Sequence, residues 1–218
     1  MAKRIDGIVL FGDVVGSRHR PDTTAWLEQL IERLGHLYRD SMLAGFDFTQ
    51  GDELQGLLRL DADPFQAVLS GMLTAGDDVP EMRWVVVAGA VDPGSGPATR
   101  RNGPAFLAAR EVMAEAKHRH DRLIVRTGEP DTDVLLDDTA PVLASLIERL
   151  TQRQRKVAQM ALVEGLRQSV IAERLGVRRA TISVSFARGD VRSLSRLLDA
   201  VRKLWAIGLT RAVARAAK

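Results

Sequence analysis

Two groups of side chains in this chain could do chemistry, and they lie in different parts of the sequence. Near the C-terminus, residues 178–188 include arginines and hydroxyl side chains that we expect to be exposed, namely Arg178, Arg179, Thr181, Ser183 and Arg188. Arginine binds phosphates and guanine edges, and threonine or serine can reach bases or phosphates. Near the N-terminus, carboxylates stand where apolar segments end, at Asp13, Asp52 and Glu53. Carboxylates that lie close together in space can hold Mg²⁺.

A helix-turn-helix would position the arginines and hydroxyls. Apolar residues at helical spacing predict a short helix over 168–175, and Gly176 follows, where a tight turn requires a positive φ. A second helix is predicted over 178–188. Ala172 is the small residue expected where the two helices approach most closely, and Ile182 is expected to pack the second helix onto the first. The alternative is a helical hairpin that serves only for packing.

Charge is distributed unevenly along the chain. Residues 149–218 hold 16 Lys and Arg against 4 Asp and Glu, whereas residues 1–148 hold 15 against 24. This asymmetry is expected when one domain faces nucleic-acid phosphates and the other does not. We therefore predict double-stranded DNA as a partner, contacted by the five side chains named above and by Gln168. Which of them read bases and which only position the helix stays open.

The segment 150–188, LTQRQRKVAQMALVEGLRQSVIAERLGVRRATISVSFAR, resembles the helix-turn-helix of LuxR-type and sigma-factor-like DNA-binding domains. One departure is Arg178, which stands where those domains usually have Ser or Thr as the N-cap of the recognition helix. The change either weakens the start of that helix or adds a phosphate contact. Because most helix-turn-helix proteins bind two half-sites as two-fold dimers, we expect a homodimer.

The carboxylates would be positioned by a sheet. Strands are predicted over 5–11, 46–60 (a hairpin turning at Gly51 and Asp52), 82–91 and 122–126, and helices over 24–41, 63–75 and 104–118. This order predicts an α+β fold with a ferredoxin-like βαββαβ domain, a largely antiparallel sheet and helices on one face. An acidic loop over 131–138 and a helix over 141–150 would lead into the C-terminal helices. We therefore divide the chain into domains at 1–138 and 139–218.

In a βαββαβ sheet, the strand that ends at Asp13 lies beside the strand that follows Asp52. Both carboxylates would then point into one cleft and form a Mg²⁺ site, with Glu53 as a third ligand. The alternative is that Asp13 and Asp52 are turn residues, chosen because aspartate bonds to its own backbone in turns. From the residues alone, both interpretations stay open.

Four segments, FGDVVGSR, TQGDELQGLL, RWVVVAGAV and GPAFLAAR, resemble the SatD family in their order and spacing. The same blocks over residues 5–127 are similar, more distantly, to class III nucleotidyl cyclases and GGDEF-type synthases, which share a palm-like ferredoxin fold. This resemblance implies that Asp13 and Asp52 are metal ligands that bridge Mg²⁺ to nucleotide phosphates. It implies a ligand-binding set of Asp13, Ser17, Arg18, Asp52, Glu53 and Arg110.

The same resemblance argues against catalysis. Arg110 matches the cyclase arginine that steadies charge on phosphate, but the asparagine beside it is replaced by Phe106. The lysine that commonly precedes the hairpin "GD" and contacts the base has no counterpart. Since phosphoryl and nucleotidyl transfer depend on positioning and charge stabilisation, we expect a nucleotide binder without turnover. Whether the protein is an enzyme stays open.

The leading hypothesis is a DNA-binding transcriptional regulator whose degenerate cyclase-like domain binds or senses a nucleotide, with Mg²⁺ as an accompanying ion. The alternative is an active metal-dependent nucleotidyl cyclase or nucleotide hydrolase with an accessory DNA-binding domain. A third hypothesis is a scaffold whose helical C-terminus binds another protein.

Composition sets outer limits on these hypotheses. The chain has 218 residues, 45% of them hydrophobic and 27% charged, which is sufficient for a packed core. It has no cysteine, and this excludes disulfides, thiolate metal sites and cysteine nucleophiles. No apolar stretch approaches the roughly 20 residues of a membrane span, and the N-terminal apolar run is too short for a signal peptide. We therefore expect a cytoplasmic protein with no membrane partner.

Overall fold

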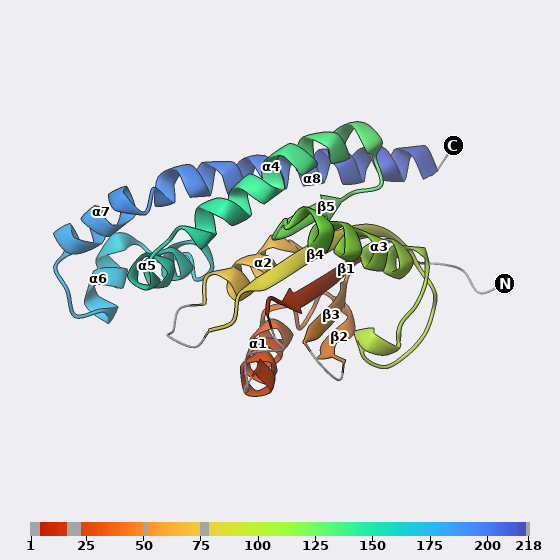
Figure 1. Cartoon of the computed structure of the whole chain (residues 1–218), viewed down its shortest axis with the longest axis horizontal. Coiled ribbons are helices and arrows are strands. Elements are labelled where there is room, and N and C mark those ends of the chain that lie inside the picture. The colour runs from red at the N-terminus through yellow and green to blue at the C-terminus, as the bar shows by residue number, and fades with distance from the viewer. Residues whose placement is uncertain (1–4, 17–22, 50–51, 75–78, 217–218) are drawn as a thin grey trace.

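The computed structural model describes residues 5–16, 23–49, 52–74 and 79–216. Over these residues the fold is mixed α+β, with one five-stranded sheet and eight α-helices (Figure 1). The strands are β1 (Ile5–Val14), β2 (Met42–Phe48), β3 (Glu53–Leu58), β4 (Met82–Val91) and β5 (Leu123–Arg126). The helices are α1 (Thr23–Leu37), α2 (Phe65–Met72), α3 (Pro104–Arg119), α4 (Pro130–Glu148), α5 (Gln152–Leu162), α6 (Gln168–Arg174), α7 (Arg179–Arg188) and α8 (Val191–Ala216). A short 3₁₀ helix, η2 (Ala98–Arg100), precedes α3.

The sheet has the strand order β2-β3-β1-β4-β5. β1 pairs antiparallel with both β3 and β4, and β2 pairs antiparallel with β3. β4 and β5 are parallel. Since parallel neighbours need a crossover connection, α3 carries the chain from the end of β4 back to the start of β5. The sheet is therefore largely antiparallel, with one parallel pair at its edge.

Helices cover both faces of the sheet. Side chains alternate along each strand, so Ile8, Leu10 and Trp84 pack in one core cluster with α1, α2, α4 and α8. Phe11 and Val85 belong to a second cluster, on the opposite face, with α3. The prediction that the helices lie on one face was therefore wrong, because α3, the crossover between β4 and β5, lies opposite α1 and α2.

A continuous helix replaces the acidic loop predicted over 131–138. α4 begins at Pro130 and continues through Glu148, and the Glu129 side chain caps it by accepting a hydrogen bond from Thr132 N at 2.9 Å. Acidic residues in the first turn favour a helix start, which explains why an acidic stretch is helical here. The predicted division between residues 138 and 139 falls inside α4, so no loop separates the two parts of the chain there.

The last helix, α8, connects the C-terminal helices to the sheet layer. It has 26 residues and lies alongside α4 (Figure 1). Trp205 packs edge-on against Phe65 of α2, with ring centroids 6.1 Å apart, and Arg202 pairs with Asp63 at 2.6 Å.

Among the described residues, no helix is both long enough and apolar enough to cross a membrane.

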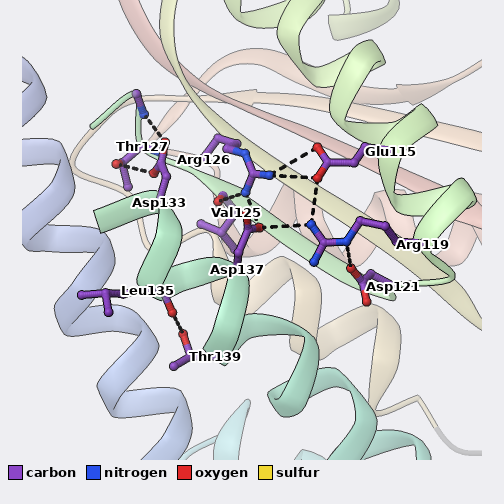
Figure 2. A network of polar contacts seen from close by, with 11 residues as sticks. Glu115, Arg119, Asp121, Val125, Arg126, Thr127, Asp133, Leu135, Asp137 and Thr139 are labelled. Carbon is purple, nitrogen blue, oxygen red and sulfur yellow. Dashed lines mark hydrogen bonds and ion pairs between the residues drawn. The ribbon is translucent and has the colours of Figure 1, made fainter. Parts of the chain in front are cut away.

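A network of ion pairs joins the outer edges of α3, β5 and α4 (Figure 2). Arg126 of β5 pairs with Glu115 of α3 at 3.3 Å and with Asp137 of α4 at 2.5 Å. Arg119 pairs with the same Glu115 at 2.8 Å and with Asp121 at 2.8 Å. The side chains are partly exposed, so each pair contributes little free energy on its own. The network nevertheless occupies both arginines with carboxylates.

Candidate functional site

The helices predicted near the C-terminus are α6 and α7, joined by a tight turn. Gly176 has a φ of +60°, and Val177 N donates to Ala172 O at 3.0 Å. A side chain with a Cβ is strained at a positive φ, so this turn favours glycine. The structure confirms the predicted helix over 168–175 and the predicted turn nearly to the residue.

A small apolar core holds α6 and α7 against α5. Ala172 and Ile182, the two predicted packing residues, are 4% and 0% exposed. They lie in one cluster with Val157 of α5 and Ile171 of α6. Burial of these side chains fixes the angle between α6 and α7 and leaves the other side of α7 facing solvent.

The exposed side of α7 carries most of the side chains that the sequence predicted to contact DNA. Gln168, the first residue of α6, is half-buried, and the other five are exposed, namely Arg178, Arg179, Thr181, Ser183 and Arg188. Arg178 is the N-cap residue of α7, and its side chain makes no capping hydrogen bond. A guanidinium has donors and no acceptor, so Arg178 cannot cap α7 through its side chain. Whether these residues touch DNA stays a prediction.

The arginines around α7 have no carboxylate partner within the described part of the chain. This holds for Arg178, Arg179 and Arg188, and also for Arg167 before α6 and Arg192 at the start of α8. The one ion pair inside α5 to α7, over those residues, joins Arg174 to Glu164 at 2.7 Å. Unpaired guanidinium groups keep all their donors for an anionic ligand. This end of the molecule is therefore an open cationic surface.

The three N-terminal acidic residues lie near one another along the backbone at one end of the sheet. Asp13 lies opposite Glu53 in the β1–β3 ladder, so both side chains are on the same face. The backbone of Asp52 is adjacent, because Val14 N donates to Asp52 O at 3.1 Å. Glu53 accepts a hydrogen bond from Gln55 Nε2 at 2.7 Å.

Asp13 is 5% exposed and already has two cationic partners. Lys117 Nζ lies 2.7 Å from its Oδ1, and Arg83 Nη1 lies 3.3 Å from its Oδ2. Burial lowers the pKa of Arg83, and the charge of Asp13 opposes this shift. A divalent cation at Asp13 would have to displace Lys117 and stand beside a buried guanidinium. As arranged here, these side chains do not fit a Mg²⁺ ion.

The remaining residues of the predicted ligand site are more scattered. Ser17, Arg18 and the turn residue Gly51 lie outside the described residues. Arg110 is exposed in the middle of α3, two helical turns or roughly 10 Å before Lys117, so it is not beside Asp13. Within the described residues, no group of three or more His, Asp or Glu is arranged to hold a metal ion. The Mg²⁺ and nucleotide ligands stay predictions.

Phe106, the position that the cyclase resemblance aligns with an asparagine, is a core residue. Its ring is fully buried and packs against Phe11 of β1 with centroids 6.1 Å apart. Its apolar side chain therefore stabilises the contact between α3 and the sheet.

Sequence reasoning missed the two cations that neutralise Asp13. One signal was available for Arg83, which is the sole charge in the strand MRWVVVAGAV. A charge inside a buried apolar strand must be paired, so it should have been assigned a carboxylate partner. Lys117 gives no such signal, because lysine near the end of a helix is ordinarily solvated.

Two comparisons relate the chain to known proteins. The model of the SatD family matches residues 7–183. The chain is also similar to the ECF RNA polymerase sigma factor SigK of Mycolicibacterium vanbaalenii, with 29% identity over 196 residues, which covers 85% of this chain and 96% of that relative. The family match extends from β1 into α7, so it includes both the sheet and the α6–α7 turn. The chain therefore belongs to the SatD family.

Proposed function

We propose that this protein is a DNA-binding transcriptional regulator, in which α6 and α7 form a helix-turn-helix and α7 is the recognition helix. The observation that carries the proposal is the row of exposed arginines on and beside α7 that pair with no carboxylate in the described chain. The relative named as an ECF RNA polymerase sigma factor supports a role in transcription.

The geometry of α7 suits insertion into DNA. The major groove of B-DNA admits one α-helix, and the side of α7 opposite the buried Ile182 has exposed side chains throughout. The first turn of α7 holds Arg179 and Thr181 and no acidic residue. Arginine can bind guanine through two hydrogen bonds, and threonine can contact bases or phosphates. We assign base contacts to the first half of α7.

Binding to DNA from the protein's own promoter region tests this proposal. Fluorescence anisotropy across a salt series should show sequence-selective binding that weakens steeply as salt rises. Arg179→Ala and Thr181→Ala should each weaken binding to the selected site. Arg100→Ala is the control, since Arg100 is exposed on η2, at the other end of the molecule from α7 (Figure 1). If both α7 variants bind like the wild type, α7 is not the recognition helix.

We also propose that the sheet layer is a ferredoxin-like, cyclase-related domain that binds a nucleotide. The order β2-β3-β1-β4 over the first four strands supports this assignment. Arg110 is an exposed cation of α3 with no carboxylate partner in the described chain, and it would contact a nucleotide phosphate directly. No step through Mg²⁺ is part of this proposal, because Asp13 is already paired with cations.

Calorimetric titration with ATP, GTP and cyclic dinucleotides, each with and without Mg²⁺, tests the nucleotide proposal. Saturable binding that Arg110→Ala weakens would support it. Metal-dependent turnover abolished by Asp52→Ala would instead support the alternative of an active nucleotidyl cyclase or nucleotide hydrolase.

The protein is proposed to act as a homodimer, since two-fold proteins match two DNA half-sites. Light scattering of the purified protein, alone and with DNA, gives its mass directly. A monomer on a single half-site would rule the dimer out.

A further inference from the structure

A groove lies between the recognition helix and the first turn of the last helix. It has a volume of about 940 Å³. Its walls come from four segments that are separate in sequence: the end of α5, the start of α6 with the residues just before it, one side of α7, and the start of α8. The polar side chains that matter here are Arg167, Ser169, Arg179, Ser183, Arg192 and Ser193.

The lining of the groove is cationic and rich in hydrogen-bond donors. All six of these side chains are exposed, and none of the three arginines pairs with a carboxylate in the described chain. Asp190 is the one acidic residue of the lining. The first turn of α8 contains no acidic residue. Three guanidinium groups beside three hydroxyls are suited to phosphate oxygens, which accept charge-assisted hydrogen bonds.

The groove divides the exposed residues of α7 into two sides. Arg179 and Ser183 are four residues apart, so they share one face of the helix, and both line the groove. Thr181 and Arg188 lie on the other side of α7 and do not line it. The residues predicted as one DNA-binding set therefore have two different surroundings.

We infer that this groove binds the sugar-phosphate backbone of one DNA strand, and that α8 contacts the DNA directly through Arg192 and Ser193. The inference rests on the proposed DNA-binding function and deepens it. Ser183 on α7 and Arg167 before α6 hold the same strand from the other walls. These phosphate contacts fix the position of the helix on DNA and carry no sequence information, whereas Arg179, which also lines the groove, keeps the base contact assigned to α7.

The inference gives α8 a place between DNA and the sheet layer. Arg192 in its first turn contacts DNA, and ten residues later, about 15 Å along the helix, Arg202 pairs with Asp63. Trp205 follows and packs on Phe65 of α2. One continuous helix thus joins the phosphate contact to the core of the sheet layer.

A matched pair of arginine variants tests the groove. Arg192→Ala should weaken DNA binding roughly tenfold at low salt and lower the slope of log affinity against log salt by about 1. The loss should be equal on selected and on random DNA. Arg211→Ala removes the same charge from the exposed far end of α8 and should leave both quantities unchanged. Both positions are exposed, so circular dichroism should show an unchanged fold.

A position-specific cleavage experiment gives an independent reading. The chain has no cysteine, so Ser193→Cys provides a single site for an iron–EDTA reagent. With the reagent attached at position 193, bound DNA should be cut near the selected site. With the reagent attached at the exposed control position, in Thr210→Cys, bound DNA should not be cut.

The outcomes separate this inference from the proposed function. If Arg192→Ala matches the wild type while Arg179→Ala loses affinity, the groove inference fails and the recognition helix stands. If the wild type binds no DNA, both fail. Binding of polyglutamate without DNA binding would assign the groove to an acidic protein segment, and would likewise overturn the inference.

Discussion

Four arginines of the sheet layer and the arginines around α7 are the same residue type in two opposite states. In the sheet layer, Arg83, Arg119, Arg122 and Arg126 each pair with one or more carboxylates. Around α7, over the described residues, Arg167, Arg178, Arg179, Arg188 and Arg192 pair with none. Pairing, as well as composition, therefore makes one end of the molecule available to anions.

Net charge therefore understates the contrast between the two regions. A paired arginine contributes donors and charge to its carboxylate, and little of either to an external ligand. The acidic surplus of residues 1–148 is partly spent on these internal pairs. Most of the positive surplus of residues 149–218 stays unpaired in the described chain, since only Arg174, Arg202 and Arg215 pair with carboxylates there.

The helix α8 contains both unpaired and paired arginines. Its first turn carries the unpaired Arg192, and its later turns carry Arg202 paired with Asp63 and Arg215 near Glu129. The two regions are thus not independent parts, because one helix belongs to both. Breaking its contacts tests how far the regions are coupled.

Removing the buried tryptophan of α8 should have the largest effect. Trp205 is 5% exposed and packs on Phe65. Trp205→Ala should destabilise the protein by about 3 to 5 kcal/mol, the usual cost of truncating a buried tryptophan. Urea denaturation followed by circular dichroism measures it. Ile207→Ala, at an exposed position of the same helix, is the control and should stay within about 0.5 kcal/mol of the wild type.

The number of unfolding transitions decides what that loss means. If the sheet layer and the C-terminal helices share one core, Trp205→Ala should shift a single cooperative transition. A separate early transition of α5 to α8, with the sheet unaffected, would show that the two regions fold independently.

Removing the carboxylate from a buried pair should cost nearly as much. Asp13→Ala leaves the guanidinium of Arg83 buried without a carboxylate, and breaking such a pair costs about 3 kcal/mol. Asp61→Ala is the matched control, because the Arg59–Asp61 pair is exposed and worth less than about 1 kcal/mol. The two variants are compared by urea denaturation at neutral pH. Equal losses would mean that the burial of Asp13 does not matter.

Local patterns in the sequence predicted much of this structure. The strand over 82–91, the turn at Gly176 and the packing of Ala172 and Ile182 are as predicted, because each depends on neighbours close in sequence. The partners of Asp13 were not predicted. Arg83 lies 70 residues away along the chain, and no periodicity reports a pair at that distance.

Which face of the sheet α3 covers also could not be predicted from local sequence patterns. Helical spacing in 104–118 predicts a helix with an apolar side, and it says nothing of which side of the sheet that helix covers. The prediction for residues 131–138 failed for a different reason. The aspartates of this segment favour a loop by composition, whereas in the folded chain Glu129 caps the helix α4 and Leu136 and Ala140 are buried.

The smallest effect expected here concerns the cap of α4. Glu129 accepts hydrogen bonds from the hydroxyl and the backbone N of Thr132, at 2.7 and 2.9 Å, and these bonds lower the pKa of Glu129. A lowered pKa in the folded state means that the ionised carboxylate stabilises the fold. This stabilisation is fully present above the unfolded-state pKa of about 4.3. It is lost as pH falls through the lower folded-state pKa.

Glu129→Gln isolates this charge, because glutamine keeps an acceptor oxygen and the shape of the side chain. The variant should be less stable than the wild type at neutral pH, by less than Asp13→Ala, and the difference should shrink as the pH falls below the usual range of glutamate. Thermal unfolding of both proteins over an acid-to-neutral series measures the difference. A gap that stays constant with pH would show that the hydrogen-bond geometry of the cap, and not the charge of Glu129, holds the start of α4. In that case the carboxylate near Arg215 would contribute no charge pairing to α8, and the far end of that helix would be held by packing alone.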